Sequence, residues 1–219
     1  MAHPLTRHAG HEAALSLPGV DIEARARQRG IALPPDGARQ APLSQWFTPP
    51  DLAARFVAWC EVMPEWTVLE PSAGDGALVR PLRKSCRHVE AVEVDPAFSE
   101  RHGWETGDYL TRPAPATRYD MVVMNPPYED GVDGRFLAKA MDEATRVVAL
   151  VRLNVLVGQE RYARAWSRVG AEWSLAGVAF LVGRPSFSAA GQATSSPLSD
   201  FVAVKLTREM MPTMVEWWA

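Results

Sequence analysis

Apolar residues along this chain occur in two alternating patterns. Short continuous apolar runs, typical of strands buried on both faces, are separated by stretches in which apolar residues recur every three or four positions, as on one side of a helix. The runs predict seven strands, at 67–70, 89–94, around 104–105, 119–124, 146–153, 173–182 and 201–207. The intervening stretches predict helices that include 48–59, 77–84, 135–145 and 159–169.

This alternation predicts an α/β fold with a doubly wound, mostly parallel sheet. The last two predicted strands have no helix between them, which predicts an antiparallel hairpin at one edge. Thr48 is expected to be the N-cap of the first helix, ahead of prolines in its first turn. Residues 208–219 are rich in Met and Trp, so we expect them to pack on the core, with contact to a partner as the alternative.

The segment 1–43 lacks this regularity. It contains five prolines with scattered His and Arg, and we expect a partly ordered extension ahead of a domain at 44–219. His3, His8 and His11 could bind a metal. A flexible His-containing tail is favoured, because no Cys or carboxylate completes a metal site.

Composition narrows the class of protein. A length of 219 residues with 47% hydrophobic residues is enough for one sizeable core. The net charge of −3 excludes a chain that is basic throughout but allows a local basic patch. Cys60 and Cys86 lack metal-ligand spacing and are expected to be buried thiols in a reducing compartment. No apolar run approaches the ~20 residues of a membrane span, and no apolar signal core opens the chain, so we expect a cytoplasmic protein.

Polar groups follow three of the predicted strands. The segment 70–76, Glu-Pro-Ser-Ala-Gly-Asp-Gly, has small residues that let the backbone approach a ligand, although a tight strand–helix turn explains it equally well. Glu93 ends the second strand, where an acid commonly accepts hydrogen bonds from ribose hydroxyls. Asp108 could accept from the exocyclic amine of a nucleoside. Each acid could instead be a solvated strand end, but the three in order favour a nucleoside site.

The segment Asn125-Pro126-Pro127-Tyr128 follows the apolar run 119–124. Two prolines remove two backbone donors and keep their carbonyl acceptors. Asn125 adds a side-chain acceptor and Tyr128 adds a flat ring. Two acceptors and a stacking face at a strand end can hold a planar amine.

Taken together, these segments resemble the S-adenosylmethionine-dependent amino-methyltransferases. The segments that carry the resemblance are Thr48-Pro49-Pro50, 68–76, 92–96, 107–110 and 125–128. The order, with the Thr-Pro helix before the glycine loop, resembles the gamma-type adenine-N6 DNA methyltransferases over about residues 46–207. The resemblance implies a Rossmann-like, seven-stranded methyltransferase sheet with S-adenosylmethionine as the cofactor.

The resemblance also implies which residues hold that cofactor. From the methionine end towards the adenine end they are Thr48, Pro49, Glu70, Ser72, Gly74, Glu93, Asp108 and Tyr109. Glu93 would take the ribose hydroxyls and Asp108 the adenine amine. Tyr109 would pack on the cofactor base, and a buried core tyrosine is an equal alternative.

In the same way, the resemblance assigns the catalytic role to Asn125, Pro126, Pro127 and Tyr128. The Asn125 side chain and the Pro126 carbonyl would accept both N–H groups of the amine and aim its lone pair at the sulfonium methyl. Tyr128 would stack on the target base, which in duplex DNA must first be flipped out of the helix.

The long polar loop at 184–200 is expected to bind substrate. Similar phage-encoded methyltransferases carry an Arg-Pro-x-Phe segment there, matched by Arg184 and Phe187. Arg184 could contact a phosphate. Phe187 could be a second stacking face, or it could only cover the core.

The expected function is adenine-N6 methylation of DNA with low or short-site specificity, by a small phage- or prophage-like enzyme. Larger gamma-type enzymes carry a separate target-recognition domain, so specificity here is expected to come from loops, the N-terminal extension or a partner subunit. One alternative keeps the chemistry but changes the substrate to RNA or to a protein glutamine amide. Another is a non-catalytic binding subunit with a methyltransferase fold.

Overall fold

The computed structural model of this chain describes residues 46–128, 131–183, 185, 188–189 and 199–219. The chain divides into two units, Met1–Ala41 and Pro42–Ala219, and every described residue belongs to the second. The predicted extension at 1–43 therefore lies outside the described residues. No helix in the described part of the chain is long and apolar enough to cross a membrane.

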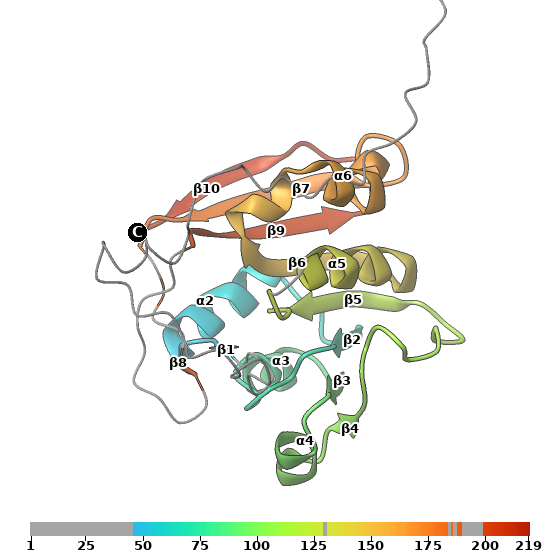
Figure 1. Cartoon of the computed structure of the whole chain (residues 1–219), viewed down its shortest axis with the longest axis vertical. Coiled ribbons are helices and arrows are strands. Elements are labelled where there is room, and N and C mark those ends of the chain that lie inside the picture. The colour runs from blue at the N-terminus through green and yellow to red at the C-terminus, as the bar shows by residue number, and fades with distance from the viewer. Residues whose placement is uncertain (1–45, 129–130, 184, 186–187, 190–198) are drawn as a thin grey trace, which may run out of the picture. The chain divides into compact units, whose positions relative to one another are not determined.

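An eight-stranded sheet forms the centre of the second unit, in the strand order β10-β7-β9-β6-β5-β2-β3-β4 (Figure 1). The strands are β2 (Thr67–Glu70), β3 (His88–Glu93), β4 (Glu105–Thr106), β5 (Tyr119–Met124), β6 (Ala144–Arg152), β7 (Ser174–Leu181), β9 (Phe201–Thr207) and β10 (Met214–Trp218). A separate antiparallel pair joins β1 (Trp46–Phe47) to β8 (Ser188–Ala189).

The strand directions confirm the predicted mostly parallel sheet with an antiparallel hairpin. Strands β4, β3, β2, β5 and β6 run parallel to one another. Strand β9 runs antiparallel to both of its neighbours, β6 and β7. The expectation of seven strands is wrong by one, because Met214–Trp218 adds an eighth strand parallel to β7. Trp218 at its end is only 5% exposed, whereas Trp217 faces solvent.

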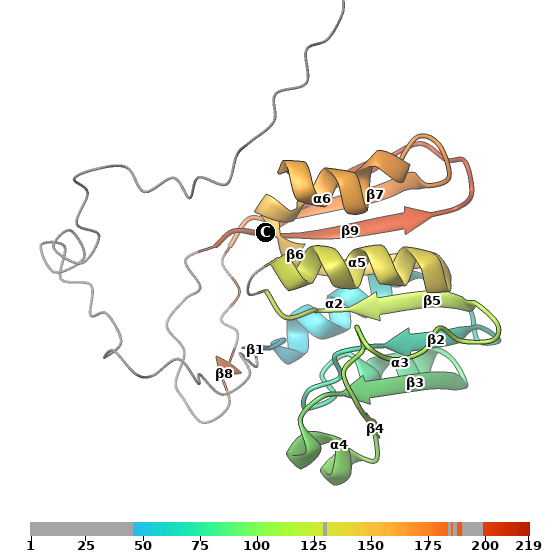
Figure 2. The same cartoon turned by 45° about the vertical axis from the view of Figure 1, so that its right-hand side comes forward.

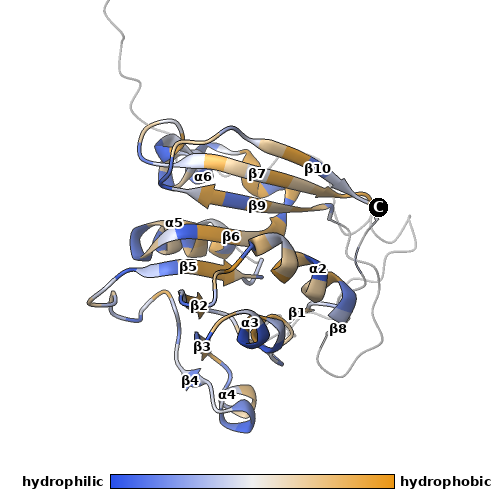
Figure 3. Cartoon of the chain, turned by 180° about the vertical axis from the view of Figure 1, so that it is seen from behind, coloured by the Kyte–Doolittle hydropathy of each residue, from blue (hydrophilic) through white to orange (hydrophobic). Residues whose placement is uncertain are grey.

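Helices cover both faces of the sheet (Figures 2 and 3). Helices α2 (Pro50–Cys60) and α3 (Val79–Ser85) pack on one face, and α5 (Val132–Glu143) and α6 (Gln159–Arg164) lie over the other. Short 3₁₀ turns span Leu153–Leu156 and Trp166–Arg168, and α4 (Pro96–His102) precedes β4. Because side chains alternate along a strand, the apolar run of β5 supplies both cores: Met121 and Val123 face α2, while Val122 and Met124 face α5.

Beyond small shifts at the ends of elements, two local expectations differ from the structure. Helix α2 begins at Pro50 with Pro49 as its N-cap and no side-chain capping bond, so Thr48 is not the cap. Proline suits this position because it lacks the N–H that the first turn leaves unpaired. The predicted helix at 159–169 ends as an α-helix at Arg164 and resumes only as the 3₁₀ turn. Because Thr48 does not cap α2, its hydroxyl is available for a different hydrogen bond.

Candidate active site

The sheet order brings most of the predicted residues to one edge. Strands β5, β2, β3 and β4 are consecutive neighbours and all run parallel, so their carboxyl ends meet on the same side. Asn125, Glu70, Glu93 and Asp108 stand at or just after those ends. Ligands of open α/β sheets bind at this edge, and the four residues follow one another along it in that order.

Glu93 ties two segments of this edge together. Its Oε2 accepts a hydrogen bond from the Gly74 amide at 2.7 Å, and its Oε1 accepts from the Asp95 amide at 2.9 Å. Gly74 has a φ of 51°, and a Cβ added there would lie 3.2 Å from the ring of Phe47. Glycine is therefore required both by the backbone and by the close ring. Each Glu93 oxygen keeps a second lone pair with which to accept a ligand hydroxyl.

Glu70 is the most deeply buried acid of this edge, at 1% exposure. Its Oε1 accepts from the Ser72 amide at 3.1 Å and from the Ser72 hydroxyl at 3.0 Å. Burial raises the pKa of Glu70 to about 8, even though the two bonds from Ser72 favour the ionised form. A cation bound next to Glu70 would favour its ionised form and lower that pKa.

The Asn125 side chain lies at the centre of a hydrogen-bond chain. Its Nδ2 donates to the Thr48 hydroxyl at 2.9 Å and to the Trp46 carbonyl at 3.4 Å, while its Oδ1 accepts from the Tyr128 hydroxyl. The Asn125 backbone carbonyl accepts from the Ser72 hydroxyl at 3.2 Å. The predicted catalytic segment is thus joined directly both to the predicted Thr-Pro turn and to the Glu70–Ser72 pair.

Tyr128 is packed inside the site, at 6% exposure. Its ring meets the Phe201 ring edge-on with centroids 5.3 Å apart, and the Arg152 guanidinium lies 5.6 Å from the Tyr128 centroid. Arg152 also donates to the Tyr128 carbonyl and pairs with the fully buried Asp133 at 3.3 Å. The hydroxyl of Tyr128 uses one of the two lone pairs of the Asn125 oxygen that is expected to bind the amine.

The two prolines lie between these residues. Pro126 is buried and Pro127 is half-buried. Because neither proline has a backbone N–H, neither can donate a backbone hydrogen bond to the acceptors around it. Pro49, on the Thr48 side of the site, is also half-buried.

Asp108 and Tyr109 take different positions. Asp108 is exposed, its Oδ1 accepts from the Leu110 amide at 2.9 Å, and its segment is tied to β3 by the Gly107 amide, which donates to the Glu93 carbonyl at 3.0 Å. Tyr109 is buried in the core, with its ring 5.0 Å from that of Phe136. Burial raises its pKa well above the usual range. These contacts match the core alternative for Tyr109.

Three residues at this edge were not predicted from the sequence. The Phe47 ring packs 5.2 Å from that of Phe98, beside Gly74. The Trp104 indole donates to the Gly74 carbonyl at 3.3 Å. Arg152 ends the strand beside β5, and a basic residue at the carboxyl end of a predicted strand is a signal that could have identified it. The contacts of the two aromatic residues depend on the fold alone.

The predicted substrate residues Arg184 and Phe187 lie outside the described residues. Of the predicted loop 184–200, the structure describes residue 185, strand β8 and residues 199–200. The pairing of β8 with β1 places part of this loop beside the segment that leads into Thr48.

Comparison with known proteins gives three relevant likenesses. No protein-family model matches the chain. An rRNA methyltransferase from Streptomyces thermotolerans is 33% identical over 128 residues, covering 52% of this chain and 42% of that relative. A modification subunit assigned to a type I restriction enzyme of Vibrio vulnificus superposes with a TM-score of 0.60 at 15% identity, over 87% of this chain and 49% of that one. A structure assigned as an RNA methyltransferase of Pyrococcus horikoshii gives a TM-score of 0.59 at 20% identity, over 77% and 89%.

The structural likenesses establish the fold. The chain has the Rossmann-like architecture of S-adenosylmethionine-dependent methyltransferases, as its segments predicted. It spans less than half the length of the rRNA methyltransferase and about half that of the modification subunit.

Proposed function

We propose that this chain transfers a methyl group from S-adenosylmethionine to the N6 amine of adenine in DNA. The observation that carries the proposal is the position of Asn125 at the carboxyl end of β5, where its backbone carbonyl accepts from Ser72 of the Glu70–Ser72 pair and its side chain bonds Thr48. An amine acceptor and a cofactor pocket must adjoin for direct transfer, because in-line attack requires the nitrogen close to the methyl carbon.

The residues of the edge fit the cofactor. The buried Glu70 carboxyl, held by Ser72, would accept from the ammonium of its methionine part, and the charge of that ammonium would favour the ionised carboxylate. The free lone pairs of Glu93 suit its ribose hydroxyls, and the exposed carboxylate of Asp108 suits an adenine amine. S-adenosylmethionine would supply a methyl group activated on a sulfonium.

Asn125 and Pro126 would orient the amine. The Asn125 Oδ1 and the Pro126 carbonyl would each accept one N–H, which turns the nitrogen lone pair towards the methyl group. The Tyr128 hydroxyl bonds the same Oδ1, which has a second lone pair for the amine, but Tyr128 must move for its ring to reach the base. Its ring is then available to stack on the base. On transfer, the sulfur would keep the electron pair of the C–S bond, and the methylated nitrogen would become acidic and release its proton to solvent.

A specific observation favours RNA as a second candidate substrate: the relative from Streptomyces thermotolerans is an rRNA methyltransferase. The likeness to a modification subunit supports in turn a partner that supplies site recognition for DNA. The N6 amine of adenine is the same group in DNA and in RNA. Contacts outside the amine site must therefore decide between the two polymers.

Incubation with methyl-labelled cofactor and single-stranded DNA, duplex DNA or RNA, followed by nucleoside analysis, tests the proposal. We expect N6-methyladenine in DNA. Labelled N6-methyladenine found only in RNA would make RNA the substrate. If none of the three nucleic acids yields a labelled nucleoside, both the DNA and the RNA proposals are refuted.

The role of Asn125 is tested by a matched pair of variants. Asn125→Ala removes the acceptor and should abolish transfer while keeping cofactor affinity. Asn125→Asp keeps an acceptor oxygen and should retain measurable transfer. Equal loss in both, with unchanged thermal stability and cofactor binding, would contradict an acceptor role.

A further inference from the structure

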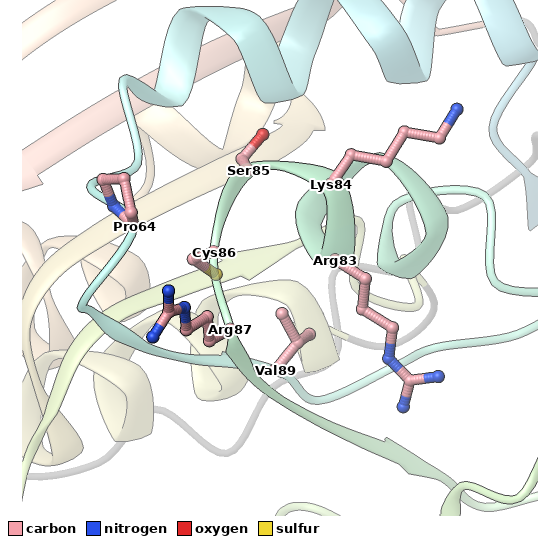
Figure 4. Close-up of a pocket in the computed structure, with 7 residues that line it drawn as sticks. All are labelled: Pro64, Arg83, Lys84, Ser85, Cys86, Arg87 and Val89. Atoms are coloured by element: carbon pink, nitrogen blue, oxygen red, sulfur yellow. The ribbon is translucent and has the colours of Figure 1, made fainter.

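A hollow of about 640 Å³ lies where α3 ends and β3 begins. Its lining contains three cations, Arg83, Lys84 and Arg87, and no acid. The close-up in Figure 4 shows the side chains of Arg83 and Arg87 on opposite sides of Val89. The hollow thus combines three cations with an uncharged lining of Pro64, Ser85, Cys86 and Val89.

These three cations are available to a ligand. All three are exposed, and within the described part of the chain no carboxylate forms an ion pair with any of them. The Arg83 guanidinium lies 4.9 Å from the centre of the Trp104 ring, which restricts its motion. The Arg87 amide donates to the Pro64 carbonyl at 3.2 Å and anchors the rim. A local patch of this kind stands out in a chain whose net charge is −3.

The Lys84 and Arg87 end of the hollow lies far from the active-site edge, whereas Arg83 reaches Trp104, whose indole bonds the Gly74 carbonyl of that edge. Strand β3 begins at His88 beside the hollow and ends at Glu93 in the active site. Its six residues span about 17 Å or more at ~3.3 Å per residue. A ligand that occupies both places must be an extended one, and small metabolites are too short.

We propose that this hollow binds the sugar-phosphate backbone of the nucleic-acid substrate while a base of the same strand occupies the active site. Guanidinium and ammonium groups are the usual partners of phosphate oxygens, and such contacts position a substrate without reading its sequence. At ~3.4 Å per nucleotide step, a substrate must extend at least about five steps to reach both places. The inference rests on the proposed nucleic-acid substrate and adds a length requirement to it.

Direct binding tests the proposal without requiring turnover. Fluorescence anisotropy with labelled DNA or RNA of about 25 nucleotides, over a series of salt concentrations, gives the number of phosphate contacts. Lys84→Ala combined with Arg87→Ala should weaken binding about tenfold at low salt. The slope of log K against log salt should fall by about 1.4 to 1.8, for two contacts. Transfer to a substrate of about four nucleotides should not change.

The matched control carries the same change in charge on the opposite face. Arg135 and Arg164 are exposed on α5 and α6, and their double alanine variant should keep the wild-type salt slope. An equal fall in both double variants, or none in the first, would overturn the proposal. If the wild-type protein binds neither DNA nor RNA, the proposed function fails together with it. If the wild type binds and methylates long substrates but the Lys84 and Arg87 changes have no effect, the hollow alone is refuted.

Discussion

Replacing Glu70 by Gln should change the pH dependence of stability more than any other substitution at the active-site edge. The carboxyl of Glu70 is 1% exposed and its pKa in the folded protein is about 8, against 4.5 in the unfolded chain. Burial causes the rise, because the charged form loses its solvation. Gln keeps the oxygen that accepts from the Ser72 amide and hydroxyl, but it carries no titratable proton.

The sign of the effect follows from proton binding. Between pH 4.5 and about pH 8 the folded protein keeps the Glu70 proton that the unfolded chain has released. The contribution of Glu70 to stability is therefore fully present below pH 4.5 and is lost as the pH rises through about 8. At about 1.36 kcal/mol per pH unit, the loss between pH 4.5 and neutrality is about 3 kcal/mol.

Urea unfolding of the wild-type and Glu70→Gln proteins at several pH values, without cofactor, measures this effect. The stability of the variant relative to the wild type should increase by up to about 3 kcal/mol from pH 4.5 to neutrality. Contributions of other groups cancel in the difference. A difference that does not vary with pH would show that Glu70 is ionised in the folded state and would refute the reasoning.

Glu216→Gln is the opposite-sign control. Bonds from the Trp59 and Trp218 indoles hold the pKa of Glu216 below its usual value. Its contribution to stability is therefore present above the unfolded pKa and is lost as the pH falls. The Glu216→Gln variant should become less stable relative to the wild type as the pH rises.

Three further substitutions test contacts of the same edge. Thr48→Val leaves the Asn125 amide with one long hydrogen bond, so it should cost about 1 kcal/mol in urea unfolding and lower the kcat of methyl transfer. Gly74→Ala puts a methyl group 3.2 Å from an aromatic ring at a positive φ, and should cost at least about 1 kcal/mol and weaken cofactor binding by calorimetry. Arg152→Met removes one guanidinium from the buried Asp133 and should cost about 3 kcal/mol, part of which Asp133→Asn should restore in a double-mutant cycle.

Much of the fold was predictable because its signals are local. The strands at 67–70, 119–124 and 201–207 match the structure residue for residue, since each is a continuous apolar or β-branched run closed by turn residues. The strand β10 was missed because Met and Trp pack equally well in a strand, a loop or a helix. That segment becomes a strand because it pairs with the otherwise unpaired edge of β7.

The sequence predicted that the candidate site residues follow strand ends, but not which atoms they contact. Glu70, Glu93 and Asn125 each follow a strand, which the sequence shows directly. The bond from Asn125 to Thr48 joins residues far apart in the chain, as does the packing of Phe47 beside Gly74. Such pairs depend on how separate elements meet, and a single sequence carries no pattern for them.

The sequence by itself determined the α/β class, the parallel core and which polar residues follow the strand ends, because side-chain periodicity and residue type are properties of short segments. Only the tertiary structure decided that Tyr128 closes onto Asn125, that Tyr109 belongs to the core and that Arg83, Lys84 and Arg87 line one hollow. Those outcomes depend on burial and on distances between elements, which arise when the strands associate into one sheet.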